Sequence, residues 1–565
     1  MTSTTELLPG EAQPLPDEGH VTALVADVVA ERAQHLFGLM GNGNVHLISR
    51  LTRRGFPFTS ARHESATVAM ADAYYRATGN IAAATTTYGA GFTNAYSTLA
   101  EARMARIPLV LVVGDAPSTG QRSFDIDQTK AAKAAGVVTL VARPGNAAAI
   151  THRAFDLAFQ TVQPVVLALP YDLATAPPTA PEALEPLPGK PLWPAQPADL
   201  DRVASLLAGA KRPLILGGRG MLMAGAASAV REAGDRIGAL FMTTVMASNA
   251  FNSPWDLGIA GGFTRSHRLD IARQADVVLV IGASQNTFQT RYGTLFPAQT
   301  TVVRIDNEPD TGSPAVAEYI RADIPSFTDG LLERLPHVRP TWRDHAPDVS
   351  GPDFRSSHPR ENPDEFGPDG RLNPRAVVAA LDGILPAERS VVMDGGHFIG
   401  WAPMYLSVPD PHAMILVGTA FQSIGMGFGS ASGVSVARPE RTTVLVSGDG
   451  GGLMGLADFE TFLRVTRKGV VVVLNDSAYG AELHQYAAKG LHDQAMLIDE
   501  VDFAAVGRAL GANGTKAHTL ADLEHLQGWL ASNQNGVYVL DVAISRKVVA
   551  EFMAESVAAK GCARE

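Results

Sequence analysis

The hydrophobic positions of the chain follow two spacings, one typical of helices and one typical of buried strands. Residues 21–29 carry valine and leucine at intervals of three and four, which predicts an amphipathic helix. Residues 36–40, 81–88, 108–115 and 164–173 are short, largely apolar runs. Such runs are typical of strands that are covered on both faces of a parallel sheet. Because helix-length stretches separate the runs, we expect a doubly wound sheet in this part of the chain.

The same alternation occurs twice more, and two proline-rich segments separate the three regions. The later apolar runs lie at 213–216, 240–245, 277–282 and 301–305, and then at 390–393, 444–446 and 470–474. We therefore predict an α/β protein with three doubly wound parallel-sheet domains. The expected boundaries are a disordered arm at 1–18, domains at 19–185, 198–335 and 373–548, a linker at 336–372 and a tail at 549–565.

Composition and charge argue against several classes of protein. The 565 residues carry a formal net charge of -11, and the isoelectric point is near 5.8. Nucleic acid or an anionic membrane surface would be repelled, so we expect neither as a partner. The single cysteine, Cys562, cannot form an internal disulfide. No apolar run reaches the roughly eighteen residues of a membrane span. The first residues lack a signal-peptide pattern, so we expect a cytoplasmic protein.

The strongest chemical signal lies in the third region. One apolar strand leads into the turn GDGGG at 448–452, and the next strand ends in Asn475 and Asp476. Because neighbouring parallel strands end at the same edge of a sheet, we expect Asp449, Asn475 and Asp476 to lie close together. Their oxygens, beside bare glycine backbone, suit a divalent cation that grips a phosphate. The alternative is an ordinary strand–turn–helix crossover in which Asp449 caps the helix.

The spacing of these two signals resembles a family motif. Residues 451–474, twenty-four positions, separate Gly450 from Asn475. This is similar to the thiamine diphosphate motif of acetohydroxyacid synthases, benzaldehyde lyases and pyruvate decarboxylases. The resemblance implies that the third domain binds the diphosphate and Mg²⁺. The implied metal ligands are Asp449, Asp476 and a backbone carbonyl near Ala478, with Asn475 as an outer or substitute ligand. The amides near the diphosphate would be those of Gly448, Gly450 and Gly451.

Two further segments extend the resemblance to the other parts of the cofactor. Glu64 follows His63 at the start of a predicted helix, and a Gly-x-Gly-x-Thr-Asn turn stands at 89–94, as in the pyrimidine-binding domain of the group. Glu64 would then hydrogen-bond the pyrimidine ring, although a carboxylate there is also a common helix cap. In the loop GTAFQSIG at 418–425, Ile424 would bend the cofactor and the carbonyl of Gln422 would accept its amino group. Ile424 is as readily an ordinary core residue.

The polar candidates for the substrate pocket are Tyr88, His397, Glu482 and His484. Glu482 lies six residues after Asp476, where pyruvate decarboxylases also carry a glutamate. Each histidine is also compatible with a purely structural role. The pair of adjacent histidines that pyruvate decarboxylases carry near position 115 is absent here, where the chain reads GDAPSTGQRSF. This favours carboligation over release of an aldehyde.

The resemblance implies a thiamine diphosphate- and Mg²⁺-dependent enzyme that decarboxylates a 2-oxo acid and joins the remainder to a carbonyl acceptor, as acetolactate synthases do. The alternatives are a carbon–carbon lyase or a non-oxidative decarboxylase, a flavin-dependent oxidoreductase of the pyruvate oxidase type, and a non-catalytic family member. We do not expect FAD, because the turn at 217–220 lacks the full dinucleotide-binding spacing. Glu64 and Asp449 belong to different domains, and the family joins them across subunits, which implies a homodimer or homotetramer.

Overall fold

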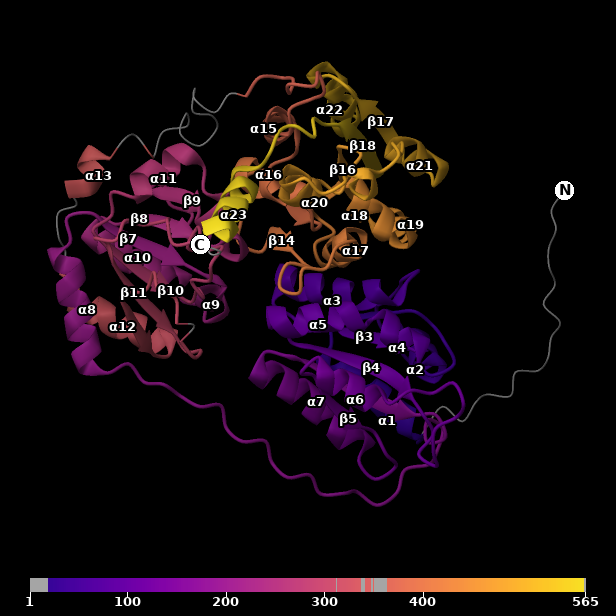
Figure 1. Ribbon diagram of the computed structural model, residues 1–565. Helices are drawn as coiled ribbons and strands as arrows, with labels where there is room; N and C mark the ends of the chain where they lie inside the picture. Colours follow the sequence, from indigo (N-terminus) through magenta and orange to yellow (C-terminus); the bar gives the residue numbers. More distant parts are fainter. Residues whose placement is uncertain (1–18, 311, 337–340, 347–348, 350–362, 563–565) are drawn as a thin grey trace. The chain divides into compact units, whose positions relative to one another are not determined.

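The computed structural model describes residues 19–310, 312–336, 341–346, 349 and 363–562. It contains three six-stranded sheets in which every paired strand is parallel, as predicted (Figure 1). The chain divides into two compact units, the first made of Met1–Tyr75 and Asn80–Pro188 and the second of Arg76–Gly79 and Gly189–Glu565. The arm expected at 1–18 and much of the linker expected at 336–372 lie outside the described residues.

The sheet of the first unit has the order β2-β1-β3-β4-β6-β5. Its central strand β4 is buried along nearly its whole length, which explains the continuous apolar run in the sequence. Helices α3 and α5 cover one face, and α1 and α7 cover the other (Figure 1). The strands are β1 (Leu36–Gly38), β2 (Phe58–Ser60), β3 (Ala83–Thr86), β4 (Leu109–Asp115), β5 (Val138–Val141) and β6 (Pro164–Pro170). The helices are α1 (Val21–Arg32), α2 (Val45–Arg53), α3 (Glu64–Thr78), α4 (Ala90–Asn94), α5 (Tyr96–Ala105), α6 (Gln128–Ala134) and α7 (Ala147–Thr161).

The second unit contains the other two sheets. The first of them has the order β12-β11-β10-β7-β8-β9, so successive strands are added outward in opposite directions from the central pair β7 and β10, which are themselves parallel. Its strands are β7 (Pro213–Gly217), β8 (Leu240–Thr243), β9 (Asp256–Ile259), β10 (Val277–Ile281), β11 (Thr301–Asp306) and β12 (Glu318–Arg321). Its helices are α8 (Pro197–Gly209), α9 (Arg219–Met223), α10 (Ala227–Ile237), α11 (Ser266–Ala272) and α12 (Ile324–Arg334), and a short helix α13 (Thr341–His345) follows.

The last sheet has the order β14-β13-β15-β16-β18-β17. Its strands are β13 (Arg389–Met393), β14 (Met414–Leu416), β15 (Thr442–Gly448), β16 (Lys468–Asn475), β17 (Asn513–Ala517) and β18 (Gly536–Ala543). Its helices are α15 (Pro374–Ile384), α16 (Trp401–Tyr405), α17 (Gly427–Ala437), α18 (Asp449–Met454), α19 (Phe459–Val465), α20 (Gly480–Tyr486), α21 (Phe503–Ala509), α22 (Glu524–Ala531) and α23 (Glu551–Cys562). Strands β15 and β16 are direct neighbours, with Gly448 opposite Leu474. The turns after these two strands therefore emerge side by side.

The sequence indicated a tail from residue 549, and its described part is ordered. Residues 551–562 form helix α23, in which Phe552 and Met553 are buried. Phe552 packs edge-on against Phe263 and Phe288, at 5.5 and 6.0 Å between ring centroids. The buried side chains explain why this segment is held against the rest of its unit. In the part of the chain that the structure describes, no helix combines the length and the apolar character needed to cross a membrane.

Candidate active site

Asp449 and Asp476 lie at adjacent strand ends and approach the same backbone segment. Asp449 begins α18 directly after β15, and Asp476 follows β16. Both side chains are buried, and the backbone N–H of Ala478 interacts with both carboxylates. Oδ2 of Asp449 is buried without a hydrogen-bond partner among the described residues. A Cβ at Gly480 would lie 2.9 Å from Oδ2 of Asp476, so the chain passes close to the second carboxylate as well.

The electrostatics of this pair favour a bound cation. Burial, and then the negative charge of Asp476, raise the pKa of Asp449 to about 7. Burial also raises the pKa of Asp476 to about 6, against the lowering effect of the Arg546 guanidinium. Two buried carboxylates that resist ionisation are stabilised when a divalent cation neutralises them.

The donor set fits Mg²⁺ held together with a phosphate. Within the described residues, no three His, Cys, Asp or Glu side chains are grouped so that they could hold a metal. A cation here would therefore take two carboxylates from the chain, and its other ligands would be backbone, phosphate or water oxygens. Mg²⁺ sites commonly combine one or two carboxylates with phosphate oxygens in this way.

The side chain of Asn475 is occupied in holding the fold. Its Nδ2 donates to the carbonyl of Val501 at 2.9 Å and to Oδ1 of Asp541 at 3.0 Å. Its Oδ1 accepts the backbone N–H of Ser477 at 3.3 Å. The two bonds from Nδ2 join the end of β16 to β18 and to the segment before α21, and the third closes the turn after β16. The arrangement favours Asp476 over Asn475 as a metal ligand.

Asp394 is a buried residue of the site that the sequence interpretation missed. It follows β13, and its Oδ1 accepts the backbone N–H groups of Gly395 at 2.7 Å and Gly425 at 3.0 Å. Ser447 donates to its Oδ2 at 3.2 Å, and burial raises its pKa. The signal in the sequence was an Asp-Gly-Gly turn after an apolar strand, the same pattern that drew attention to Asp449.

The loop at 418–425 places Ile424 against two glycines. A Cβ at Gly395 would lie 3.2 Å from Cγ1 of Ile424, and a Cβ at Gly451 would lie 3.3 Å from its Cγ2. Ile424 is nevertheless 39% exposed, which is unusual for an isoleucine in ordinary core packing. Gln422 has a positive φ of 59°, so its backbone adopts the left-handed conformation that residues other than glycine rarely adopt. This apolar side chain therefore stands at the edge of the glycine turn.

The structure brings His397 and His484 together. Their ring centroids are 4.5 Å apart. Burial, with the nearby His484 and Arg375, lowers the pKa of His397 to about 3, and burial lowers the pKa of His484 as well, so both rings are neutral near pH 7. Nε2 of His397 accepts the backbone N–H of Ala550 at 2.9 Å, whereas Nε2 of His484 is buried without a partner among the described residues.

Glu482 does not join the two histidines. It lies two residues before His484 on α20, and residues two apart on a helix point about 200° apart. The side chain of Glu482 is exposed, while His484 turns toward His397.

Glu64 begins α3 in the first unit. Asn94, at the end of the Gly-x-Gly-x-Thr-Asn turn, donates from Nδ2 to Oε2 of Glu64 at 2.9 Å. A Cβ at Gly91 would lie 3.4 Å from Oε1. His63 accepts the backbone N–H of Ser65 at 3.3 Å, so it caps the start of the helix. The His-Glu pair at 63–64 and the turn at 89–94, the two motifs on which the resemblance in this domain rests, are therefore in direct contact.

Tyr88 belongs to an aromatic cluster near the same turn. The guanidinium carbon of Arg122 lies 4.4, 4.6 and 4.8 Å from the ring centroids of Tyr88, Phe124 and Tyr171. Arg122 forms a two-pronged ion pair with Asp125 at 2.8 and 2.9 Å. No local sequence pattern predicts this cluster, because its members come from three separate segments.

The glycine-rich turn after β7 does not form a phosphate cradle. The N–H of Gly218 donates to the carbonyl of Ile281 at 2.9 Å, and that of Gly220 donates to the carbonyl of Gly282 at 2.9 Å. A Cβ at Gly218 would lie 2.2 Å from the oxygen of Gly282, so glycine serves the close approach of two strand ends. A dinucleotide needs such amides for its pyrophosphate, and here two of them are committed to backbone.

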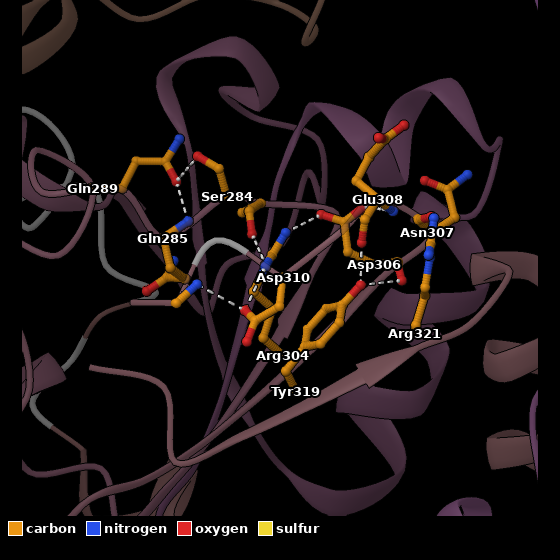
Figure 2. Close-up of polar contacts among 12 residues, drawn as sticks. Ser284, Gln285, Gln289, Arg304, Asp306, Asn307, Glu308, Asp310, Tyr319 and Arg321 are labelled. Carbon is orange, nitrogen blue, oxygen red and sulfur yellow. Dashed lines mark hydrogen bonds and ion pairs between the residues drawn. The ribbon is translucent and has the colours of Figure 1, made fainter. Parts of the chain in front are cut away.

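The neighbouring strand ends carry a polar cluster of their own (Figure 2). Arg304, which is 1% exposed, donates from Nε to the carbonyl of Ala283 at 2.7 Å and from Nη2 to Asp306 at 2.8 Å. The hydroxyl of Tyr319 donates to the backbone oxygen of Asp306 at 3.2 Å. The buried guanidinium is thus neutralised within the chain.

Comparison with known protein families accounts for all three domains. Three models match: the N-terminal TPP binding domain of thiamine pyrophosphate enzymes at residues 20–135, their central domain at 200–331, and their C-terminal TPP binding domain at 394–542. The matched ranges contain Glu64 in the first domain and both Asp449 and Asp476 in the last.

Curated relatives match over most of their length at low identity. A sulfoacetaldehyde acetyltransferase of Castellaniella defragrans is 25% identical, over 92% of this chain and 91% of the relative. The large subunit of acetolactate synthase isozyme 3 of Escherichia coli is 26% identical, over 89% and 90%. A sulfoacetaldehyde acetyltransferase of Roseovarius nubinhibens is 26% identical, over 89% and 88%. With three matched domains and relatives of this kind, the chain belongs to the thiamine diphosphate-dependent enzymes.

Proposed function

We propose that this protein is a thiamine diphosphate- and Mg²⁺-dependent carboligase that decarboxylates a 2-oxo acid and joins the remaining acyl unit to a carbonyl acceptor. The observation that carries the proposal is the meeting of Asp449 and Asp476 at the N–H of Ala478, with Ile424 standing beside the same glycine turn. Asp449 and Asp476 would thus hold the diphosphate end of the cofactor, and Ile424 would support its bent conformation from a neighbouring turn at the same edge of the sheet.

Each group of residues would have a separate task toward the cofactor. Asp449, Asp476 and the backbone at Ala478 would hold Mg²⁺, while the amides of Gly450 and Gly451 approach the diphosphate. Ile424 would fill the space under the bent cofactor. Glu64, held by Asn94, would hydrogen-bond the pyrimidine ring and promote loss of the proton at C2 of the thiazolium. When bound, the cofactor supplies a nucleophilic carbon that attacks the 2-oxo acid and stabilises the negative charge left after loss of CO₂.

The choice of carboligation rests on two supports. The relatives include enzymes named for acetyl transfer and for the synthesis of acetolactate. The chain also lacks the histidine pair near position 115 that would favour release of an aldehyde. Because Glu64 and Asp449 belong to different compact units, we further propose a homodimer or a higher homo-oligomer, in which Glu64 of one subunit serves the cofactor held by another.

The proposal is tested with the full-length protein, thiamine diphosphate and Mg²⁺, against a panel of 2-oxo acids with and without aldehyde or 2-oxo acid acceptors. We expect CO₂ release together with a chiral 2-hydroxyketone or 2-hydroxy-2-acyl acid, and loss of both after treatment with a chelator. Release of free aldehyde as the main product would identify a decarboxylase instead. A cofactor-loaded protein that produces no CO₂ and no ligation product across the panel would contradict the proposal.

A further inference from the structure

The turn that follows β16 has an uncommon backbone conformation directly after Asp476. Ser477 has a positive φ of 56° and is buried. Residues with a side chain rarely adopt this left-handed region, so such a turn persists only where its surroundings hold it. The same turn carries the carboxylate of Asp476 and, two residues further on, the N–H of Ala478, which interacts with both carboxylates of the proposed metal site. The groups that hold Ser477 in this conformation therefore also fix the site.

Arg546 holds two consecutive carbonyl groups of this turn. Its Nε donates to the carbonyl oxygen of Asp476 at 3.0 Å, and its Nη2 donates to that of Ser477 at 3.3 Å. Ile498 also donates its backbone N–H to the carbonyl of Ser477, at 3.0 Å. The carbonyl of Asp476, by contrast, has no other donor among the residues that the structure describes. One planar guanidinium thus spans the proposed metal ligand and the left-handed residue after it.

Backbone hydrogen bonds fix the segment that carries Arg546, directly after β18. The N–H of Ile544 donates to the carbonyl of Asn475 at 3.0 Å, and that of Ser545 donates to the carbonyl of Leu372 at 2.8 Å. The side chain of Arg546 is half-buried, and within the described ranges its guanidinium forms no ion pair with a carboxylate. A fixed backbone and the lack of a competing carboxylate commit this guanidinium to the turn.

Arg371 provides a comparison at the same sheet edge, because it also brings a positive charge near Asp476. Its Nη2 donates to the carbonyl of Asn475 at 3.4 Å, and it faces Glu500 at 3.9 Å. The carbonyl of Asn475 ends β16, before the turn, and a backbone N–H already holds it at 3.0 Å. Arg371 therefore resembles Arg546 in charge but does not hold the turn.

We propose that Arg546 is a positioning residue that holds the turn at Asp476 and Ser477 in the conformation that binds Mg²⁺, an inference that rests on the proposed function. Arg546 acts through the two carbonyl oxygens that it binds, and not by contact with the metal or the substrate. Groups that orient a metal ligand in this way contribute about 10- to 100-fold to metal affinity.

The decisive variant is Arg546→Lys, because it keeps the charge and removes the planar fork. A lysine ammonium group cannot donate to both carbonyls in the fixed geometry of the guanidinium. We expect the Mg²⁺ affinity of the full-length protein to fall by about tenfold or more, measured by calorimetric titration with Mg²⁺ at a fixed concentration of thiamine diphosphate. Arg371→Lys makes the same change at a residue that does not hold the turn, and it should stay within a few-fold of wild type. Denaturation curves show that each titrated variant is folded.

Ser477→Gly separates positioning from a general loss of stability. Glycine adopts a positive φ readily, so the turn depends less on Arg546 when glycine replaces Ser477. In the Arg546→Lys background, Ser477→Gly should restore Mg²⁺ affinity by about fivefold, a larger effect than the same change has in the wild-type background.

Two sets of outcomes separate this inference from the proposed function. Wild-type Mg²⁺ affinity in Arg546→Lys, or an equal loss in Arg371→Lys, would overturn the role of Arg546 alone. A loss that Ser477→Gly does not reduce would overturn it as well, because the turn would then not be what Arg546 holds. A wild-type protein that binds thiamine diphosphate without any dependence on Mg²⁺ would instead refute the metal site of the proposed function, and this inference with it.

Discussion

The carboxylate of Asp394 accepts the backbone N–H of Gly425 at 3.0 Å and so ties the loop that carries Ile424 to the end of β13. The same side chain accepts from Gly395 and from Ser447 of β15, so one buried group joins the turn after β13, the loop at 418–425 and the end of β15. The position of Ile424 therefore depends on a residue that would make no direct contact with substrate.

Replacing Asp394 with alanine should weaken both the fold and cofactor binding. The change leaves buried backbone donors unsatisfied, and each costs about 1–3 kcal/mol. We expect the free energy of unfolding to fall by about 2–4 kcal/mol, measured by urea denaturation, and thiamine diphosphate affinity to fall by at least about tenfold, measured by calorimetry. The exposed Asp499→Ala variant should change stability by less than about 0.5 kcal/mol. Equal effects of the two variants would show that Asp394 does not organise these turns.

Substitutions at the two strand ends should separate metal ligands from supporting residues. Asp449→Ala and Asp476→Ala should each reduce the Mg²⁺-dependent affinity for thiamine diphosphate by about 100-fold or more, since each removes a direct ligand. Asp476→Asn should lose less, because the amide oxygen can still coordinate.

Asn475→Ala should act differently, since its side chain bonds to Val501 and Asp541. We expect it to destabilise the fold by about 1–3 kcal/mol and to affect the metal only through that loss. Calorimetric titrations at fixed Mg²⁺, paired with denaturation curves, give both quantities. A stable Asn475→Ala protein that has lost metal affinity would show that Asn475 is the ligand.

The raised pKa values of the carboxylate pair should make the cofactor-free protein less stable as pH rises. Burial raises the pKa of Asp449 from 3.8 to about 7 and that of Asp476 from 3.8 to about 6. Over this range the folded state binds more protons than the unfolded chain, so the free energy of unfolding falls with increasing pH.

Mg²⁺ and thiamine diphosphate bind the ionised carboxylates and should reverse this trend. The gain in melting temperature on adding both should therefore be larger near pH 8 than near pH 5. Differential scanning fluorimetry with and without the cofactor measures it, with Asp449→Asn as the control that should flatten the pH dependence. A cofactor-induced gain that is equal at both pH values would contradict the assignment of these carboxylates as ligands.

The interior of each sheet could be predicted from the sequence, and its edges could not. Strands such as β4, β15 and β16 are covered on both faces, so their sequences are continuous apolar runs. Apart from β18, the strands that the sequence interpretation did not name are the two edges of each sheet: β2, β5, β9, β12, β14 and β17. Edge strands are short or contribute few apolar residues, so no run marks them.

The candidate site also has a part that the sequence predicts and a part that it does not. Asp449 and Asp476 could be found because β15 and β16 are consecutive in sequence and adjacent in space, so local order fixes their proximity. The bond from Ala550 to His397 joins residues 153 positions apart, and no local pattern encodes it.

Glu64→Gln should abolish turnover and leave the cofactor bound. Glutamine keeps an oxygen that can accept from Asn94, so the local structure should persist, but it cannot exchange a proton with the pyrimidine ring. Deuterium exchange at C2 of bound thiamine diphosphate should slow by about 10²-fold or more, with affinity within a few-fold of wild type. The exposed Glu185→Gln variant is the control and should behave as wild type. Normal C2 exchange in Glu64→Gln would remove Glu64 from the mechanism.

Gly451→Ala tests whether the glycine turn must be bare. A Cβ at this position would lie 2.7 Å from Oδ2 of Asp394 and 3.3 Å from Cγ2 of Ile424, so both groups would have to move. Overpacking of this kind costs about 1–3 kcal/mol, and thiamine diphosphate affinity should fall by at least about tenfold because the displaced groups border the proposed site. Gly528→Ala is the matched control, since it lies in α22 with no atom within 4 Å of the added carbon. That change should stabilise the protein by about 0.5–1 kcal/mol and leave cofactor affinity unchanged. Unaltered affinity in Gly451→Ala would mean that the cofactor does not use this turn.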